Sequence, residues 1–287
     1  MSTPTWLITG ASGGLGLALV ERVLAAGHRV VATTRGTAIP VEHPALTVMQ
    51  LDPADRAACR TVVDETVRRH GRLDVLVNNA GYGLVGAIEE VSEAQARDIV
   101  DVDLFGPLWL SQAVLPHMRA QGSGHIVQIS SVGGVGAMPF FGLYNAAKWG
   151  LEGFSEALAG EVDATGIRVT IAEIGAMDTR WATGGMRFAG PRPEYDGLRA
   201  ATLGTAEVPW PAVPDATGGG TAPQVVAAQL VDHVAQQNPG PLRLVLGQDA
   251  PAQIASVLQA RRDDYSTQPG FPAGSVDWRP RDEGGAR

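Results

Sequence analysis

The sequence contains only one cysteine, Cys59, among its 287 residues. A single cysteine forms no disulfide within the chain, and it excludes a metal site with several cysteine ligands. The sequence also lacks an apolar run of the roughly 20 residues that a membrane-spanning helix needs. Residues 1–5 contain no charged stretch that leads into an apolar one, as a secretory signal would. We therefore expect a protein that does not enter a membrane and that resides in a reducing compartment, the cytoplasm.

Positive charge is scarce as well. The chain has 22 Lys and Arg residues against 30 Asp and Glu residues, a formal net charge of −8. Proteins that bind nucleic acids neutralise phosphates with an excess of positive charge, so we expect no nucleic-acid partner. Hydrophobic residues make up 45% of the chain and charged residues 18%, which is typical of a globular protein with a large core.

Strand and helix patterns alternate along most of the chain. An apolar run at 6–8, a glycine-rich turn at 9–16, a helical pattern that ends at Gly27 and a strand at 28–34 form a βαβ unit. Further strands are expected at 46–51, 73–77, 125–129, 168–174 and 242–246, and further helices near 55–69, 92–118, 143–164, 223–236 and 250–261. The strands are almost entirely apolar, as in a sheet covered by helices on both faces. The pattern predicts an α/β fold, a doubly wound parallel sheet of Rossmann-like type in three α/β/α layers, as a single domain over 1–287.

Residues 176–221 interrupt this regular alternation. The segment is rich in proline, contains a glycine run at 218–220, and carries the aromatic residues Trp181, Phe188, Tyr195 and Trp210. A long irregular segment with this much apolar content predicts a lid over the substrate. The tail from about residue 267 is rich in proline, glycine and charge, and we expect it to be loosely attached.

Glycines cluster in the turn between the first strand and the first helix. Such a turn lets backbone amides approach a pyrophosphate, and the helix N-terminus adds a favourable partial positive charge. The spacing differs from the standard G-x-G-x-x-G fingerprint, and a glycine-rich turn can also occur without a ligand. The residues of the turn that we expect at a dinucleotide are Gly10, Ser12, Gly14, Leu15 and Gly16.

The end of the second strand bears on the choice of cofactor. NAD-specific sites usually place an acidic residue there, which accepts hydrogen bonds from the ribose hydroxyls. This chain has Thr34 followed by Arg35, and a planar guanidinium matches the oxygens of a 2′-phosphate. The pattern favours NADP(H) over NAD(H), the alternative being that Arg35 is only a solvated loop residue.

Three polar residues in the middle of the chain suit proton transfer. Tyr144 and Lys148 are four residues apart in a helical segment and share one face, while Ser131 follows a predicted strand, at the sheet edge where ligands bind. Carbonyl reduction needs a hydride on carbon and a proton on oxygen. A tyrosine can supply the proton if its pKa of about 10 falls, and a lysine cation lowers that pKa. The Tyr-Lys pair alone occurs by chance in many helices, but chance explains the pair, the serine and the glycine turn together poorly.

With these motifs in register, the chain resembles the short-chain dehydrogenase/reductase family in its compact, single-domain form. The resemblance covers roughly residues 5–180. Its segments are Thr9-Gly10-(three residues)-Gly14-Leu15-Gly16, Leu51-Asp52, Asn78-Asn79-Ala80-Gly81, Ser130-Ser131 and Tyr144-(three residues)-Lys148.

The resemblance implies roles on the cofactor side of the site. Asp52 would contact the adenine, and Asn79, with Ala80 and Gly81, would lie along the cofactor ribose. The family motif after the sixth strand, a Pro-Gly followed by a threonine, is represented by Gly175 and Thr179, but its proline is absent here.

It also implies roles at the reacting atoms. Tyr144 would be the proton donor or acceptor, Lys148 would bind the nicotinamide ribose and tune Tyr144, and Ser131 would hold the substrate oxygen. Asp103 stands where the family usually has an asparagine that helps to hold a water in a proton relay. Because a carboxylate cannot donate a hydrogen bond as the amide does, Asp103 is left out of the catalytic set. We expect no metal ion.

These features predict an NADP(H)-dependent oxidoreductase that interconverts a carbonyl and a secondary alcohol. Family members commonly associate through two long helices, so a homodimer or homotetramer is expected. One alternative is a cofactor-binding regulator or scaffold without turnover, which has no need for the Ser, Tyr and Lys trio. Another is an epimerase or dehydratase, whose glycine spacing also fits but whose branch normally carries a larger C-terminal substrate domain.

The substrate is predicted from apolar side chains near the site. An apolar pocket with a lid favours a bulky hydrophobic ketone, such as a steroid, a terpenoid or a polyketide-like compound. The alternative is that many of these side chains only pack the lid against the body. The residues concerned are Val135, Met138, Phe140, Phe141, Met177, Trp181, Met186 and Phe188.

Overall fold

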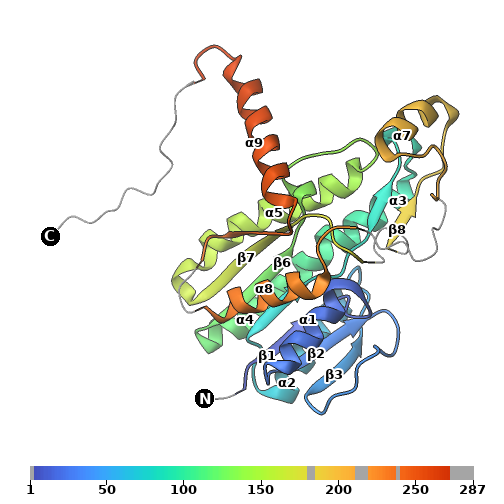
Figure 1. The fold of residues 1–287 in the computed structure, drawn as a ribbon. Helices are drawn as coiled ribbons and strands as arrows, with labels where there is room; N and C mark the ends of the chain where they lie inside the picture. The colour runs from blue at the N-terminus through green and yellow to red at the C-terminus, as the bar shows by residue number, and fades with distance from the viewer. Residues whose placement is uncertain (1–2, 180–184, 211–218, 237–239, 272–287) are drawn as a thin grey trace.

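The computed structural model describes residues 3–179, 185–210, 219–236 and 240–271 (Figure 1). Within them, seven strands form a parallel sheet in the order β3-β2-β1-β4-β6-β7-β9. The chain winds outward in both directions from β1 and β4, which confirms the doubly wound sheet predicted from the sequence. The strands are β1 (Thr5–Ile8), β2 (Arg29–Thr34), β3 (Leu46–Gln50), β4 (Val75–Asn78), β6 (Gly124–Ile129), β7 (Ile167–Ile174) and β9 (Arg243–Leu246).

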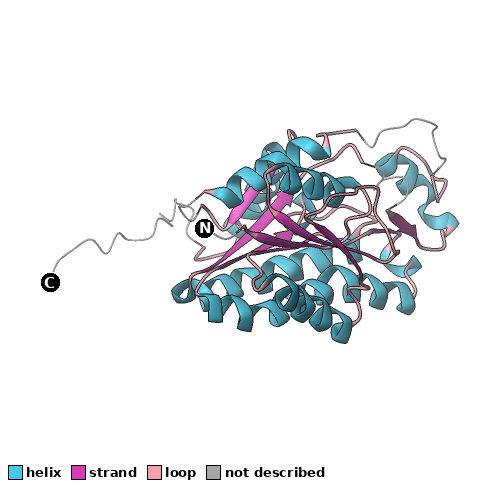
Figure 2. Ribbon diagram, turned by 90° about the horizontal axis from the view of Figure 1, so that it is seen from below, coloured by secondary structure: helices cyan, strands magenta, loops and turns pink. Residues whose placement is uncertain are grey.

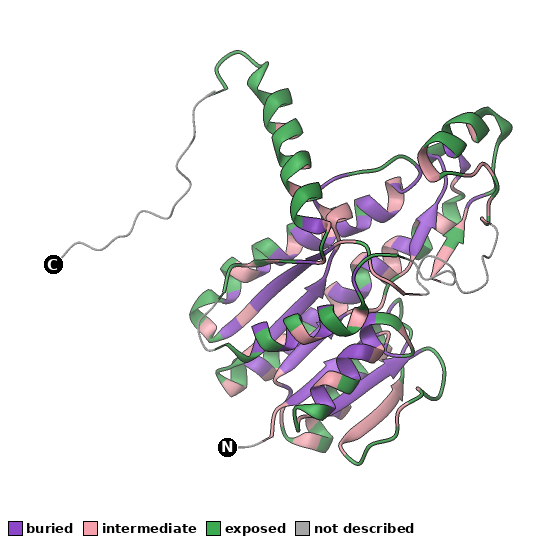
Figure 3. Cartoon of the chain, in the orientation of Figure 1, coloured by how far each residue is buried: buried purple, intermediate pink, exposed green. Residues whose placement is uncertain are grey.

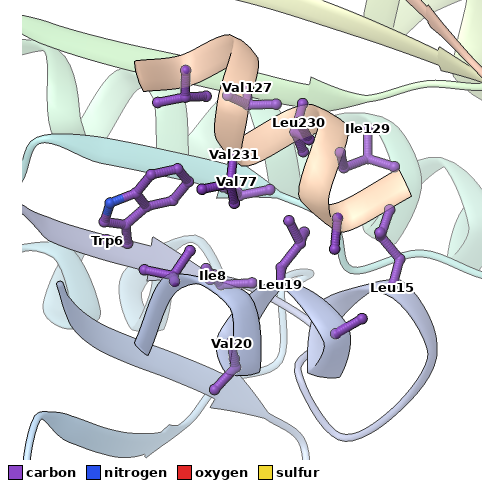
Figure 4. Packing of buried hydrophobic residues seen from close by; sticks show 14 of the residues in the cluster. Trp6, Ile8, Leu15, Leu19, Val20, Val77, Val127, Ile129, Leu230 and Val231 are labelled. Atoms are coloured by element: carbon purple, nitrogen blue, oxygen red, sulfur yellow. The ribbon is translucent and has the colours of Figure 1, made fainter. Parts of the chain in front are cut away.

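Helices cover both faces of this sheet (Figure 2). Because successive side chains of a strand point to opposite faces, Trp6 and Ile8 of β1 enter one core and Leu7 enters the other. The first core is closed by α1 (Gly14–Ala25) and α8 (Pro223–Ala235), and Figure 4 shows Leu19 and Leu230 of these helices there. The second core is closed by α2 (Arg56–His70), α4 (Gly106–Gln121) and α5 (Gly142–Val162).

The single helix expected at 92–118 is divided in the structure. Helix α3 (Glu93–Val100) continues into a π-helical turn, Asp101–Phe105, before α4 begins. The wider turn places Asp103 in the interior, where none of it is exposed. A π-turn is an irregularity that often occurs at functional sites, and the period of apolar residues in a sequence does not reveal it.

Part of the segment 176–221 has regular structure that the sequence analysis did not anticipate. Strand β8 (Met186–Phe188) pairs in parallel with β5 (Gly83–Val85), and a 3-10 turn, Pro193–Tyr195, leads into α7 (Asp196–Leu203). Figure 1 shows β8 and α7 beside α3, at one end of the main sheet. The two ends of the segment are tied to each other, because Met177 forms a parallel bridge with Thr221. Trp181 lies outside the described residues.

A buried ion pair fixes α7 to the body. Arg199 of α7 is 1% exposed and pairs with Glu90, which also accepts hydrogen bonds from the backbone amides of Ala87 and Arg192, both at 2.7 Å. A buried charge is strongly unfavourable without its partner, so the pair resists any movement that separates α7 from Glu90.

The last described helix, α9 (Ala250–Ser266), is longer than predicted. It projects from the body, and most of its surface is exposed (Figures 1 and 3). Of the tail predicted from about residue 267, residues up to 271 are described and 272–287 lie outside the described part. No helix in the described ranges is long and apolar enough to cross a bilayer.

Candidate active site

A cavity of about 900 Å³ lies along the carboxyl ends of β1, β4, β6 and β7. Every site residue proposed from the sequence lines it, together with Asp103, which that proposal left out. The convergence follows from the fold, since the carboxyl ends of parallel strands meet at one edge of the sheet. The proposed residues are Gly10, Ser12, Gly14, Leu15, Gly16, Arg35, Asp52, Asn79, Ala80, Gly81, Ser131, Tyr144, Lys148, Gly175 and Thr179.

The glycine turn forms one end of the cavity. Gly10 and Gly14 have φ angles of +66° and +54°, in the left-handed region that side chains rarely adopt. A Cβ on Gly16 would lie 2.4 Å from the carbonyl oxygen of Gly10, so a side chain there would push α1 away from the turn. Gly13 caps α1 without a side chain, which leaves the first amides of the helix available to an anion.

The loop after β4 supports this turn. The Asn79 side-chain amide donates to the carbonyl oxygens of Thr9 at 2.7 Å and Gly10 at 3.2 Å. The Thr9 hydroxyl oxygen accepts from the backbone amides of Asn79 and Ala80, at 3.0 and 2.9 Å. Asn79 thus holds the shape of the glycine turn, in addition to lining the cavity.

Arg35 and Asp52 lie at the outer rim of the cavity. Both are exposed, and each follows a strand, β2 or β3, that ends at this edge of the sheet. The Gln50 side chain donates to the Arg35 carbonyl oxygen at 2.9 Å, and the Thr34 hydroxyl oxygen accepts from the Gly36 amide at 3.1 Å. These bonds fix the backbone of the loop, and the exposed Arg35 side chain lines the rim of the cavity.

Ser131, Tyr144 and Lys148 meet at the inner end of the cavity. The Ser131 hydroxyl hydrogen-bonds to the hydroxyl of Tyr144, and its oxygen also accepts from the Gly133 amide at 3.1 Å. The Lys148 Nζ lies 5.7 Å from the centroid of the Tyr144 ring and donates to the Ile129 carbonyl oxygen at 3.2 Å. Lys148 is the only lysine in the chain, while arginine supplies the other basic residues. Its side chain is buried, with the ammonium between the Ile129 carbonyl oxygen and the Asp103 carboxyl.

Burial dominates the ionisation of Tyr144. Desolvation raises the pKa of the phenol, while Lys148 and the hydrogen bond with Ser131 lower that pKa and Asp103 raises it. The net direction is upward, so the phenol stays protonated at neutral pH. The sequence-based expectation is that Lys148, together with the positive charge of an oxidised nicotinamide, lowers this pKa. Burial of the ring outweighs the lysine here.

Asp103 is a site residue that the sequence analysis excluded. Its Oδ1 accepts from the Tyr82 backbone amide at 3.1 Å, and its Oδ2 lies 3.4 Å from the Lys148 Nζ. A Cβ on Gly81 would lie 2.8 Å from Oδ2, so the absence of a side chain there makes room for the carboxyl. Burial raises the pKa of Asp103 above its ordinary value, although Lys148 opposes the shift. The sequence signal for this residue is the departure from the family motif at Asp103, which the structure places within the π-helical turn Asp101–Phe105.

The apolar residues expected around the substrate are mostly elsewhere. Of those that the structure describes, Met177 alone lines the cavity. Phe140, Phe141, Met186 and Phe188 pack with Tyr144 in a third core between the body and residues 186–210, and Met138 is 45% exposed. For these side chains the alternative reading, packing of the segment against the body, describes the structure better.

Known proteins match the chain over most of its length. A family model described as short chain dehydrogenase matches residues 4–185. An uncharacterized oxidoreductase of Schizosaccharomyces pombe is 36% identical over 250 residues, 86% of this chain and 82% of that protein. The crystal structure of a short-chain dehydrogenase from Streptomyces avermitilis, also 36% identical, has a TM-score of 0.80 and covers 92% of this chain and 97% of its own. The chain therefore belongs to the short-chain dehydrogenase/reductase family of oxidoreductases, which use NAD(H) or NADP(H), as its motifs predicted.

Proposed function

We propose that the protein is an NADP(H)-dependent enzyme that interconverts a carbonyl and a secondary alcohol, with Tyr144 as the acid and base. The observation that carries this proposal is the convergence of Ser131, Tyr144 and Lys148 in the same cavity as the glycine turn. A cofactor whose pyrophosphate binds at the turn and which extends along the cavity would bring its nicotinamide to these three side chains.

The residues of the turn fit a dinucleotide. The turn has no side chains at Gly10, Gly14 and Gly16, so a pyrophosphate can approach its backbone closely. The first amides of α1, which no side chain caps, face the space that the pyrophosphate would fill. Asp52 would contact the adenine at the rim, while Asn79, Ala80 and Gly81 would lie along the ribose. Gly175 and Thr179 would line the nicotinamide side, and Ser12 and Leu15 the pyrophosphate.

NADP(H) is favoured over NAD(H) by the end of β2. Thr34 is neutral and Arg35 is exposed at the rim, where a 2′-phosphate would lie. A metagenomic short-chain oxidoreductase that is 29% identical, with a TM-score of 0.55, was solved in complex with NADP. The match covers 61% of this chain and 82% of the metagenomic protein's chain.

The proton step is assigned to Tyr144. NADP(H), when bound, supplies or accepts the hydride at the substrate carbon. In the direction of reduction, the protonated phenol donates to the carbonyl oxygen, and the Ser131 hydroxyl donates a hydrogen bond that orients this oxygen. Lys148, whose Nζ lies 5.7 Å from the centroid of the Tyr144 ring, stabilises the resulting phenolate and would bind the nicotinamide ribose. In the direction of oxidation, the phenolate accepts the alcohol proton.

A hydrophobic small molecule is proposed as the substrate. Curated relatives that are 36–38% identical carry the names 3-ketodihydrosphingosine reductase, retinol dehydrogenase 8 and 17-beta-hydroxysteroid dehydrogenase type 1. All three names refer to large apolar molecules. This chain covers 58–64% of the length of those proteins, so the names support a substrate class and no particular compound.

The test replaces Tyr144 by Phe and follows NADPH consumption with a panel of bulky ketones. We expect the rate to fall about a hundredfold or more, since general acid catalysis contributes on the order of 10²–10⁴. NADPH binding, measured by calorimetry, is expected to stay within a few fold. Tyr265→Phe on α9, where the tyrosine is 52% exposed, is the matched control and keeps the wild-type rate. A Tyr144→Phe enzyme with a tenth of the wild-type rate would refute the assignment, and a wild-type protein that binds NADPH without any turnover would favour the scaffold alternative.

A further inference from the structure

One face of α5 contacts three successive residues at and just after the end of β6, which are Ile129, Ser130 and Ser131. Tyr144, Lys148 and Glu152 occupy consecutive turns of this helix and are 9%, 6% and 6% exposed. Tyr144 contacts the hydroxyl of Ser131. The Nζ of Lys148 donates a hydrogen bond of 3.2 Å to the carbonyl oxygen of Ile129. Glu152 completes the series, because its Oε1 accepts from the hydroxyl of Ser130 at 2.5 Å. The proposed mechanism uses Tyr144 and Lys148 and leaves Glu152 without a role.

The turn that begins at Ser131 rests on this third contact. A Cβ on Gly134 would lie 2.1 Å from Oε1 of Glu152 and 2.5 Å from Oγ of Ser130. The backbone of the turn therefore packs directly against the two side chains. A displacement of the Glu152 carboxyl would displace the turn, and with it the Ser131 hydroxyl.

A second buried carboxyl lies beside Glu152. Glu173 of β7 is 2% exposed, and its carboxyl hydrogen-bonds to that of Glu152. Two carboxyls can form a hydrogen bond only when one of them carries a proton. Among the described residues, the other charged groups that face the pair are Arg243 of β9 and Glu156 of α5. Arg243 Nε lies 3.1 Å from Glu173 and 3.7 Å from Glu152, and its Nη2 lies 3.1 Å from Glu156.

We propose that Glu152 is a positioning residue, which holds the Ser131 hydroxyl against Tyr144 through Ser130 while it shares a proton with Glu173. The proposal rests on the function proposed above for Ser131 and Tyr144. Burial and the neighbouring Glu152 raise the pKa of Glu173 to about 7, and burial also raises the pKa of Glu152. The shared proton is thus lost as the pH rises through neutrality. Two adjacent carboxylates then repel each other with one guanidinium between them, and the support of the turn weakens.

The first test is the pH profile of ketone reduction. Wild-type kcat/KM is expected to decrease as the pH rises through about 7, which gives the profile a descending limb. Glu173→Gln is expected to remove this limb, because the glutamine amide still donates to Glu152 but does not titrate. Glu152→Ala is expected to lower kcat/KM by on the order of tenfold to a hundredfold at every pH, and Glu152→Gln to restore part of the loss through its acceptor oxygen. Glu156→Gln is the matched control, since this residue lies one turn further along α5, shares Arg243 and is largely exposed. It keeps the limb.

The second test does not depend on activity. In the wild type and in Glu156→Gln, the NMR signals of the Gly133 and Gly134 amides are expected to titrate near pH 7, and in Glu173→Gln they do not. Three results would each overturn the proposal. The Gly133 and Gly134 amide signals of the wild type do not change near pH 7, the descending limb persists in Glu173→Gln, or a folded Glu152→Ala protein has the wild-type kcat/KM. A wild type with no turnover on any ketone would refute the proposed function instead, and the amide titration would still decide whether the pair controls the turn.

Discussion

The exchange of Asp103 for Asn tests the electrostatics of the site most directly. Asparagine has nearly the same size as aspartate and keeps an oxygen that can accept from the Tyr82 amide, which now lies 3.1 Å from Oδ1. It removes the negative charge that lies 3.4 Å from the Lys148 Nζ in a position without solvent exposure. The substitution therefore changes charge with little change of shape.

The expected shift follows from the distances. The Lys148 Nζ lies 5.7 Å from the Tyr144 ring centroid, and at an effective dielectric constant of about 20 a unit charge at that distance stabilises a phenolate by about 3 kcal/mol. The Asp103 Oδ2 lies within about 9 Å of the same centroid, because it is 3.4 Å from Nζ, and it opposes the lysine by about 2 kcal/mol. Neutralising Asp103 should therefore lower the pKa of Tyr144 by about one pH unit.

The assay is the pH dependence of kcat/KM for alcohol oxidation at saturating NADP⁺. Oxidation needs the phenolate, so the rate rises with pH through the pKa of Tyr144, and Asp103→Asn is expected to move the inflection to lower pH by about one unit. Asp98→Asn, at an exposed carboxylate that pairs with Arg187, serves as the control and leaves the profile unchanged. Superimposable profiles for the wild type and Asp103→Asn would mean that Asp103 carries no charge beside Lys148, and would refute the reasoning. A shift toward alkaline pH would refute the sign.

Three further predictions follow from other parts of the molecule. Arg35→Ala is expected to weaken NADPH binding by about 1.5–3 kcal/mol and to leave NADH binding nearly unchanged in calorimetry, since a charge-assisted contact to phosphate is lost; equal losses would mean that Arg35 does not bind the 2′-phosphate. The unfolding free energy should fall as the pH rises from about 4.5 to about 7, because native Glu173 keeps a proton that the unfolded chain has released; the contribution is on the order of 3 kcal/mol, and denaturant titrations of Glu173→Gln should lack it. Light scattering at micromolar concentration should give the mass of a homodimer or homotetramer, and a monomer mass would contradict that expectation.

The parts of the fold that the sequence predicted are those determined by neighbouring residues. The βαβ unit, the apolar strands and the glycine turn each depend on a contiguous pattern, and the structure has all of them. The exceptions depend on residues far apart in the chain. Strand β5 has three residues and pairs with β8 about 100 positions later, and α7 is held by the buried pair of Arg199 and Glu90. No local period or turn signal contains such partners, so these elements could not be inferred.

The same distinction applies to the site. Tyr144 and Lys148 are recognisable because both lie on one helix face at a fixed spacing. Asp103 and Glu173 have no such relation to them. Asp103 lies beside Lys148 within a π-turn, and Glu173 reaches Glu152 because α5 packs against β7.

This limit has a chemical consequence, because the residues that sequence patterns miss are those that control the charge of the site. A buried carboxyl acts through its distance to other charges and through the loss of solvent, and neither quantity is encoded in residue spacing. Lys148 has the carboxyl of Asp103 at 3.4 Å, and one turn further along α5 Glu152 contacts Ser130, the residue before Ser131. The trio of Ser131, Tyr144 and Lys148 is the part of the site that the family resemblance implies. In this chain Asp103 and the Glu152–Glu173 pair are the neighbouring groups whose substitution should change the pH dependence while the trio stays intact.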